Sequence, residues 1–67
     1  MEKLEQLRKK AGYNFEQMAN KVNISKTFYW QIEKEDRRLS YAMAVKIADV
    51  FNLKPDDIFY DHFKSKL

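Results

Sequence analysis

The stretch that decides the fold runs from Asn14 to Glu33 and has the sequence NFEQMANKVNISKTFYWQIE. Its apolar residues recur at intervals of three and four, which is the period of a helix, whereas a strand would show a period of two. Asn14 and Ser25 belong to the residue types that cap the free N–H groups at the start of a helix. The stretch therefore predicts two short helices with residues 22–24 as the connection between them.

The first of these helices is expected to begin after Asn14 and to stop near Asn23. Gln17 stands three residues after Asn14, where a glutamine side chain completes a capping box. The apolar positions form one stripe that consists of Phe15, Met18, Ala19 and Val22. Because the second helix starts after Ser25, the connection is as tight as the turn of a helix-turn-helix motif.

The second helix, from Lys26 to about Lys34, divides into two faces when each residue is advanced by about 100°. Phe28, Tyr29 and Ile32 fall on one side and suit a hydrophobic core. The other side has a cation, a hydroxyl, an amide and an indole, from Lys26, Thr27, Gln31 and Trp30. Lysine can donate to guanine, glutamine can pair with adenine, and threonine offers a hydroxyl or a methyl group.

An ordinary solvated face is the plainer interpretation of a polar helix side. An exposed tryptophan is uncommon on such a face, however, and Trp30 can lie against a sugar or a thymine methyl, or shield the edge of an interface. Basic side chains follow the helix closely at Lys34, Arg37 and Arg38, where the backbone of a bound duplex would run. Asn14 can donate to a phosphate at the start of its helix. Together these residues predict a DNA-binding surface.

Three further helices are expected around this pair. A segment from about Glu2 to Ala11 places Leu4, Leu7 and Ala11 on one face, and Gly12 ends it because glycine tolerates a left-handed backbone. Ser40 is expected to cap a helix from about Tyr41 to Phe51. Its buried residues are expected to be Ala44, Ile47, Ala48 and Phe51.

The last helix is expected to open at Pro55, where proline is favoured in a first turn. Asp56 and Asp57 follow in the first turn, where negative charge interacts favourably with the helix dipole. The helix carries Ile58, Phe59 and Phe63. With no strand pattern elsewhere, the chain is predicted to be all-α.

Composition narrows the classes of protein. The chain of 67 residues predicts one domain over residues 1–67, and the absence of cysteine excludes disulfides and thiolate metal sites. No apolar run approaches the roughly 20 residues that span a bilayer, and the charged N-terminus lacks the apolar stretch of a secretory signal. We therefore expect a cytoplasmic protein with no membrane partner.

Charge and chemistry favour binding over catalysis. The net charge is +3, and residues 1–54 alone carry eleven basic and seven acidic side chains, which leaves a basic body and an acidic end. One histidine (His62), no cysteine and no glycine-rich phosphate loop leave little from which to build a catalytic centre. His62 is expected to be a surface residue. We expect no enzyme, no metal, no cofactor and no small-molecule effector.

The ordered motifs resemble those of the Cro/phage-repressor-like helix-turn-helix domains, often called the Xre family. The matching positions run from Leu4 to Phe59 and cover more than four-fifths of the chain. They comprise Leu-x-x-Leu-Arg at 4–8, Gly12, Glu16–Ala19, Ile24–Lys26, Ile32-Glu33, Ala44–Ala48 and the block from Phe51 to Phe59.

The resemblance implies a five-helix, lambda-repressor-like domain whose third helix enters the major groove, usually as a homodimer on a near-palindromic operator. It places Lys26, Thr27 and Gln31 at base-contacting positions, and Asn14 and the loop with Lys34, Arg37 and Arg38 at phosphate-contacting positions. It also implies a structural salt bridge between Arg8 and Glu33, so we do not count Arg8 as a DNA contact.

Two departures from the family pattern stand out. Many members have glutamine where this chain has Phe15, which is expected to pack against the core edge or the sugar backbone. Members commonly have Asn-Gly where this chain has Lys34-Glu35, so the third helix can end differently and move Arg37 and Arg38.

The C-terminal aromatic residues suggest a two-fold contact. Phe59, Tyr60 and Phe63 exceed the needs of so small a core, and we expect them to form a homodimer interface. The alternative is that they close the monomer's own core.

The function expected is sequence-specific DNA binding by a transcriptional regulator, with repression as the expected effect. A phage or mobile-element repressor and an antitoxin-like autoregulator fit the residues equally well. The rival interpretation is a protein-binding module of the same fold, such as an antitoxin or anti-repressor component.

Overall fold

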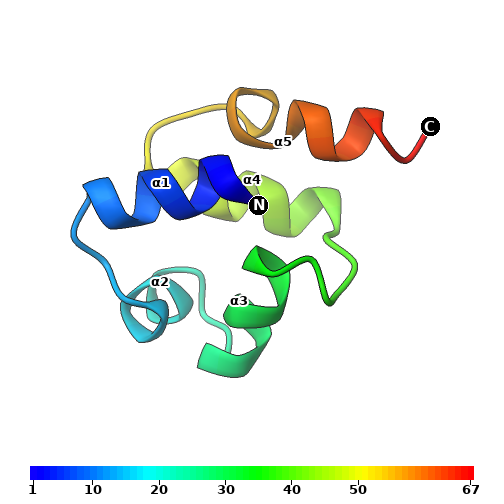
Figure 1. The fold of residues 1–67 in the computed structure, drawn as a ribbon. Coiled ribbons are helices and arrows are strands. Elements are labelled where there is room, and N and C mark those ends of the chain that lie inside the picture. The colour runs from blue at the N-terminus through cyan, green and yellow to red at the C-terminus, as the bar shows by residue number, and fades with distance from the viewer.

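The computed structural model describes residues 1–67 and consists of five helices without a strand (Figure 1). The helices are α1 (Glu2–Lys10), α2 (Phe15–Lys21), α3 (Lys26–Glu33), α4 (Tyr41–Val50) and α5 (Pro55–Lys64). The predicted all-α, five-helix fold is confirmed. Each predicted helix is present. The first four helices end one or two residues earlier than predicted.

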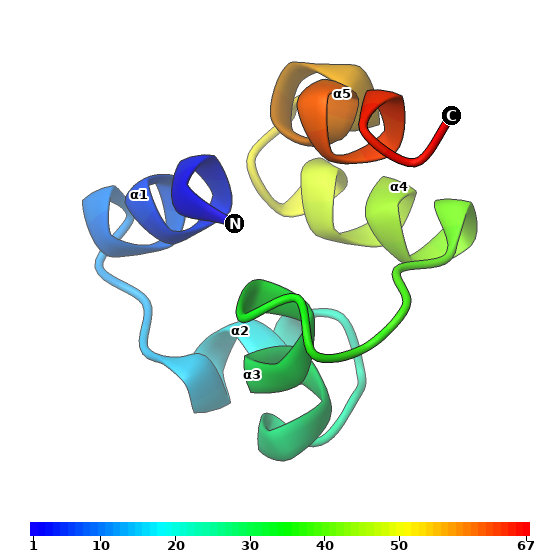
Figure 2. The same cartoon turned by 45° about the vertical axis from the view of Figure 1, so that its right-hand side comes forward.

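The helices form two packed pairs that α1 joins. α2 packs against α3, α4 packs against α5, and α1 contacts both α3 and α5. Figures 1 and 2 show α2 and α3 together at the lower end of the molecule and α5 at the upper end. The α2–α3 pair is thus exposed at one end, and the other three helices support it from behind.

The core receives residues from every helix. Twelve hydrophobic side chains are buried: Leu4, Met18, Ala19, Val22, Tyr29, Ile32, Leu39, Ala44, Ile47, Ala48, Ile58 and Phe59. The predicted apolar faces of the helices account for nearly all of them. Leu39 is the addition, and it anchors the loop between α3 and α4 with only 4% of its surface exposed.

The predicted N-terminal caps of α2, α3 and α4 are confirmed. Asn14 Oδ1 accepts from Gln17 N–H at 2.8 Å, and Gln17 Oε1 accepts from Asn14 N–H at 2.8 Å, which completes the capping box. Ser25 Oγ accepts from Phe28 N–H at 3.0 Å, and Ser40 Oγ accepts from Met43 N–H at 3.1 Å. These bonds satisfy N–H groups that would otherwise lack a partner.

Four helices end in the same backbone turn. The residues after the C-caps of α1 to α4 have a positive φ, at Gly12, Asn23, Glu35 and Asn52. In each turn the following N–H group donates to the carbonyl five residues earlier, as Ile24 N does to Ala19 O at 3.0 Å and Asp36 N does to Gln31 O at 2.8 Å. This pair of features is the Schellman motif, for which glycine and asparagine are the usual residues.

Glu35 is therefore the exceptional residue among the four. Its φ of 61° is unfavourable for a side chain longer than that of asparagine. Nevertheless α3 ends at Glu33. The absence of the family's Asn-Gly pair does not lengthen the helix.

Several expectations about single residues were wrong. Ala11 is exposed, because α1 ends one residue earlier, and Phe51 is half-buried, because α4 ends at Val50. His62, which was expected at the surface, is half-buried: 11% of its side chain is exposed, and its Nδ1 lies 3.1 Å from Glu35 Oε1. The link joins α5 to the loop after α3.

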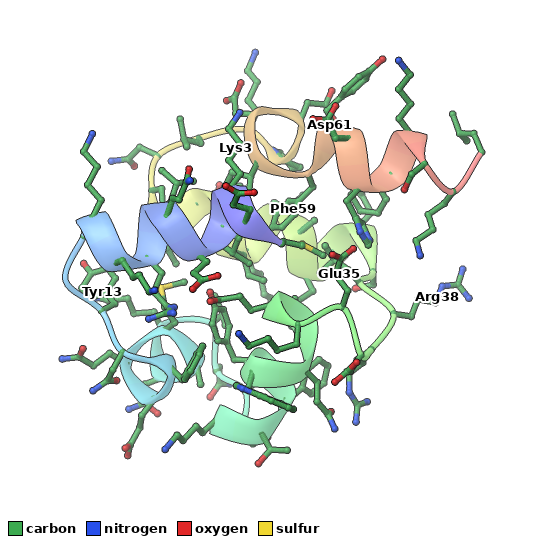
Figure 3. All side chains as sticks on the ribbon, viewed as in Figure 1. Lys3, Tyr13, Glu35, Arg38, Phe59 and Asp61 are labelled. Atoms are coloured by element: carbon green, nitrogen blue, oxygen red, sulfur yellow. The ribbon has the colours of Figure 1, made fainter.

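Phe59 corrects part of the expected dimer interface. Its side chain is fully buried in the monomer core, so it has no surface left for a second subunit. Figure 3 shows it on the inner side of α5. Phe63 is half-buried with its ring centre 6.4 Å from that of Phe59, whereas Tyr60 is 54% exposed.

None of the five helices combines the length and the apolar composition needed to cross a membrane.

Candidate nucleic-acid interface

The two faces of α3 lie as the helical period requires. Tyr29, Ile32 and Glu33 are buried, and Phe28 is half-buried at the core edge. Lys26 and Thr27 are exposed in the first turn. Trp30 is 40% exposed and Gln31 is half-buried in the next turn, so the four residues expected to contact bases share the outer face.

The turn before α3 leaves that face open. The left-handed backbone at Asn23 and the Ser25 cap direct the chain from α2 into α3 with no inserted loop. Figure 1 shows α2 and α3 beside one another at the lower end of the molecule. Lys26, Thr27 and Trp30 on the first two turns of α3 are exposed and open to a partner.

Asn14 lies at the start of α2 and is exposed. Its Oδ1 is occupied by the cap on Gln17, so only its amide NH₂ group remains for another partner. An NH₂ group is a donor, which is the kind of group that a phosphate oxygen accepts from. The cap and the expected phosphate contact are therefore compatible.

The basic residues after α3 differ in what they contact. Lys34 and Arg38 are exposed, and Figure 3 shows Arg38 directed away from the molecule. Arg37 instead folds back on α3. Its Nε donates to Gln31 Oε1 at 2.9 Å, and its guanidinium carbon lies 4.5 Å from the centre of the Phe28 ring.

Arg8 and Glu33, which the resemblance pairs, do lie together. Arg8 Nε is 2.9 Å from Glu33 Oε2, and Arg8 Nη2 is 2.9 Å from Glu33 Oε1, so the contact is bidentate. The side chains are 7% and 1% exposed. Arg8 Nη1 also donates to the Tyr13 carbonyl at 2.9 Å, and the hydrogen bonds that Arg8 donates to Glu33 raise the pKa of Arg8.

Phe15 covers this ion pair. Its ring centre lies 4.2 Å from the Arg8 guanidinium carbon and 6.3 Å from the ring centre of Tyr29. The expectation that Phe15 packs at the core edge matches this position. The ring reduces the access of water to the pair, which strengthens the attraction between the two charges.

Tyr29 lies inside the same cluster. Its hydroxyl is buried without a hydrogen-bond partner, although the Glu33 carboxylate is close. Burial raises the pKa of Tyr29 far above its usual value, and the negative charge of Glu33 acts in the same direction. The inner side of α3 is therefore buried, with Tyr29 uncharged and Glu33 paired with Arg8.

Sequence reasoning missed two contacts of this region. The Arg37–Gln31 contact depends on the path of the loop, and no helical spacing relates the two residues. The Glu35–His62 contact joins residues 27 positions apart. The only sign of the positive φ at Glu35 was that members of the family commonly have glycine at this position.

Comparison with known proteins agrees with this geometry. The family model described as a helix-turn-helix domain matches residues 1–60. The chain is also similar to the "Uncharacterized HTH-type transcriptional regulator YgzD" of Bacillus subtilis (strain 168), with 33% identity over 58 residues that cover 87% of this chain and 88% of that protein. No solved structure matches the chain.

Proposed function

The chain belongs to the helix-turn-helix domain family. We propose that it is a DNA-binding transcriptional regulator that inserts α3 into the major groove. The observation that carries the proposal is the outer face of α3, where Lys26, Thr27, Trp30 and Gln31 lie together without contributing to the core. A helix fits the major groove, and these side chains match the hydrogen-bonding groups and methyl groups of base edges.

The proposed roles follow from position. Lys26, Thr27 and Gln31 contact bases, and Trp30 packs against a sugar or a thymine methyl. The phosphates on either side of the groove are contacted by Lys34, Arg38 and Asn14. Arg37 donates to Gln31 through Nε, so its two terminal nitrogens can also contact a phosphate. The Arg8–Glu33 pair faces the other way and supports α3 from inside the domain.

We further propose that the regulator is a repressor that binds a near-palindromic operator as a homodimer. Two copies related by a two-fold axis place two α3 helices in successive major grooves, which explains the need for a palindrome. On α5, exposed Tyr60 and half-buried Phe63 are the aromatic side chains available for the contact. A phage or mobile-element origin is consistent with the family pattern.

The first test is binding to the DNA upstream of the protein's own gene, measured by fluorescence anisotropy at two salt concentrations and against random duplex. A specific regulator should prefer one palindromic segment by a factor of about 10³ or more, and binding should weaken with salt. Tight binding without preference would point to an architectural protein. No binding by the folded protein would favour a module that binds a protein partner.

Two matched variants localise the interface. Lys26→Ala removes a positive charge from the outer face of α3, whereas Lys3→Ala removes one from α1 on the opposite side of the domain (Figure 3). Lys26→Ala should weaken operator binding, and Lys3→Ala should leave it within about twofold of wild type because long-range charge effects are screened. Equal losses in both variants would contradict the placement of α3 in the groove.

A further inference from the structure

Arg37 and Gln31 meet on the exposed side of α3, although Arg37 comes from the following loop. Arg37 Nε donates to the Gln31 side-chain oxygen at 2.9 Å. The Arg37 guanidinium also lies over the Phe28 ring, 4.5 Å from its centre, which is within the range of a cation–π contact. Arg37 is thus held at two points by α3.

The backbone brings these residues together. Glu35 has a φ of 61°, which turns the chain back toward the last turn of α3. Asp36 N–H then donates to the Gln31 carbonyl at 2.8 Å. The Arg37 backbone therefore starts close to Gln31, and a folded-back side chain reaches the amide directly.

The contact decides the orientation of the Gln31 amide. An arginine side chain has donors only, so it requires the amide oxygen of Gln31 and excludes the NH₂ group from the same place. A glutamine without such a partner can present either end to a base. With Arg37 in place, the NH₂ group is the end left for DNA.

We propose that Arg37 is a positioning residue for base recognition, which orients Gln31 as a hydrogen-bond donor toward the base edge. The proposal rests on the proposed function, in which α3 lies in the major groove. Guanine, adenine and thymine present acceptors there, whereas cytosine presents only an amino donor. Gln31 oriented by Arg37 therefore disfavours cytosine at the base that it contacts.

The test uses the operator found in the binding experiment and a set of duplexes in which each base pair is varied in turn. Gln31→Ala identifies the base pair that Gln31 contacts, because discrimination is lost there. Wild type should bind cytosine at that position roughly fivefold or more weakly than the preferred base. Arg37→Ala should bring this ratio close to one at the same base pair.

Arg38→Ala is the matched control, because it removes the same charge from the next residue, which points away from α3. It should weaken all duplexes by a similar factor and leave the discrimination at the Gln31 base pair unchanged. Arg37→Lys retains the charge but replaces the guanidinium that donates through Nε while it lies over Phe28, so it should keep most of the affinity and reduce the discrimination. Circular dichroism checks that each exposed substitution leaves the fold intact.

A double variant closes the test. Gln31→Ala with Arg37→Ala should discriminate at that base pair no less than Gln31→Ala alone, because residues that act as a unit are not additive. If Arg37→Ala weakens every duplex equally, as Arg38→Ala does, the positioning role is overturned while the DNA-binding function stands. If wild type shows no sequence preference, the proposed function and this inference both fail.

Discussion

At the scale of the residue, the proposed base contacts lie on the outer face of α3 and most of the proposed phosphate contacts lie on the loop after it. Gln31 is half-buried on the helix and held by Arg37, so the direction of its side-chain amide is set within the protein. Arg38 is exposed on the loop and free to follow a phosphate. The two side chains are therefore expected to contribute different kinds of binding energy.

This difference predicts different losses in two variants. Gln31→Ala should cost about 1–3 kcal/mol of discrimination at one base pair, because it removes a contact to a base edge. Arg38→Ala should weaken all sequences alike and reduce the slope of log K against log salt by about 0.9, because it removes one phosphate contact. Titrations of operator and random duplex at several salt concentrations measure the discrimination and the salt slope. If Gln31→Ala and Arg38→Ala each lose the same affinity for operator and for random duplex, the assignment of one to bases and the other to phosphates is refuted.

At the scale of the element, the Arg8–Glu33 ion pair ties α1 to the end of α3. Both side chains are almost fully buried, and Phe15 covers them. Glu33→Ala should lower the free energy of unfolding by about 3–5 kcal/mol, because it leaves the Arg8 charge buried without its partner. Urea denaturation measures the loss.

The control for this prediction removes both charges. Arg8→Met combined with Glu33→Leu should recover most of the stability that Glu33→Ala loses, because no unpaired charge remains. A double variant as unstable as Glu33→Ala would show that the unpaired Arg8 charge is not the cause of the loss.

The Glu35–His62 contact ties the loop after α3 to α5 and makes this link sensitive to acid. The hydrogen bond from His62 lowers the pKa of Glu35 below its usual value. The carboxylate therefore contributes stability at pH values above the unfolded pKa of about 4.3, and this contribution is lost as pH falls through the lower pKa of the folded state. Glu35→Gln lacks the carboxylate at every pH.

The difference in unfolding free energy between wild type and Glu35→Gln should therefore shrink as the pH is lowered below about 4. Urea denaturation at a series of pH values from neutral to acidic measures it. A difference that stays constant across this range would show that the Glu35 charge contributes nothing to the link.

At the scale of the whole molecule, two adjacent aromatic residues of α5 lie in opposite environments. Phe59 is fully buried in the core, whereas Tyr60 is 54% exposed. Phe59→Ala should destabilise the monomer by about 3–5 kcal/mol. Tyr60→Ser should leave the thermal midpoint of the monomer nearly unchanged but lower the affinity of the proposed dimer.

Sedimentation equilibrium over a range of concentrations measures the dimer affinity of wild type and Tyr60→Ser. Thermal unfolding at low concentration measures the stability of the monomer in each variant. If wild type and Tyr60→Ser associate to the same extent, Tyr60 lies outside any dimer contact. A wild-type protein that stays monomeric at hundreds of micromolar would contradict a dimer formed without DNA.

The local features of the chain could be predicted because they depend on residues close together in sequence. Asn14 with Gln17, Ser25 with Phe28, and Ser40 with Met43 form caps within one helical turn. The helical period likewise placed Lys26, Thr27, Trp30 and Gln31 on one exposed side. The physical reason is that a helix sets the direction of each side chain from its number in the helix.

Features that join distant segments could not be predicted in the same way. The aromatic pattern of α5 did not separate buried Phe59 from exposed Tyr60, because the packing of α4 and α1 against α5 decides which residue faces inward. His62 was expected at the surface, since its partner Glu35 is distant in sequence and lies in a turn. The pairing of Arg8 with Glu33 came from the family resemblance alone.

The five helices, the caps of α2, α3 and α4 and the polar outer face of α3 follow from the amino-acid sequence, because they depend on helical geometry and on the chemistry of neighbouring residues. The return of Arg37 to Gln31, the contact between Glu35 and His62 and the burial of Phe59 follow only from the folded arrangement. Each of these depends on the path of a loop or on the packing of helices from different parts of the chain. Loop paths and packing are set by the whole fold and have no periodic signal in the sequence.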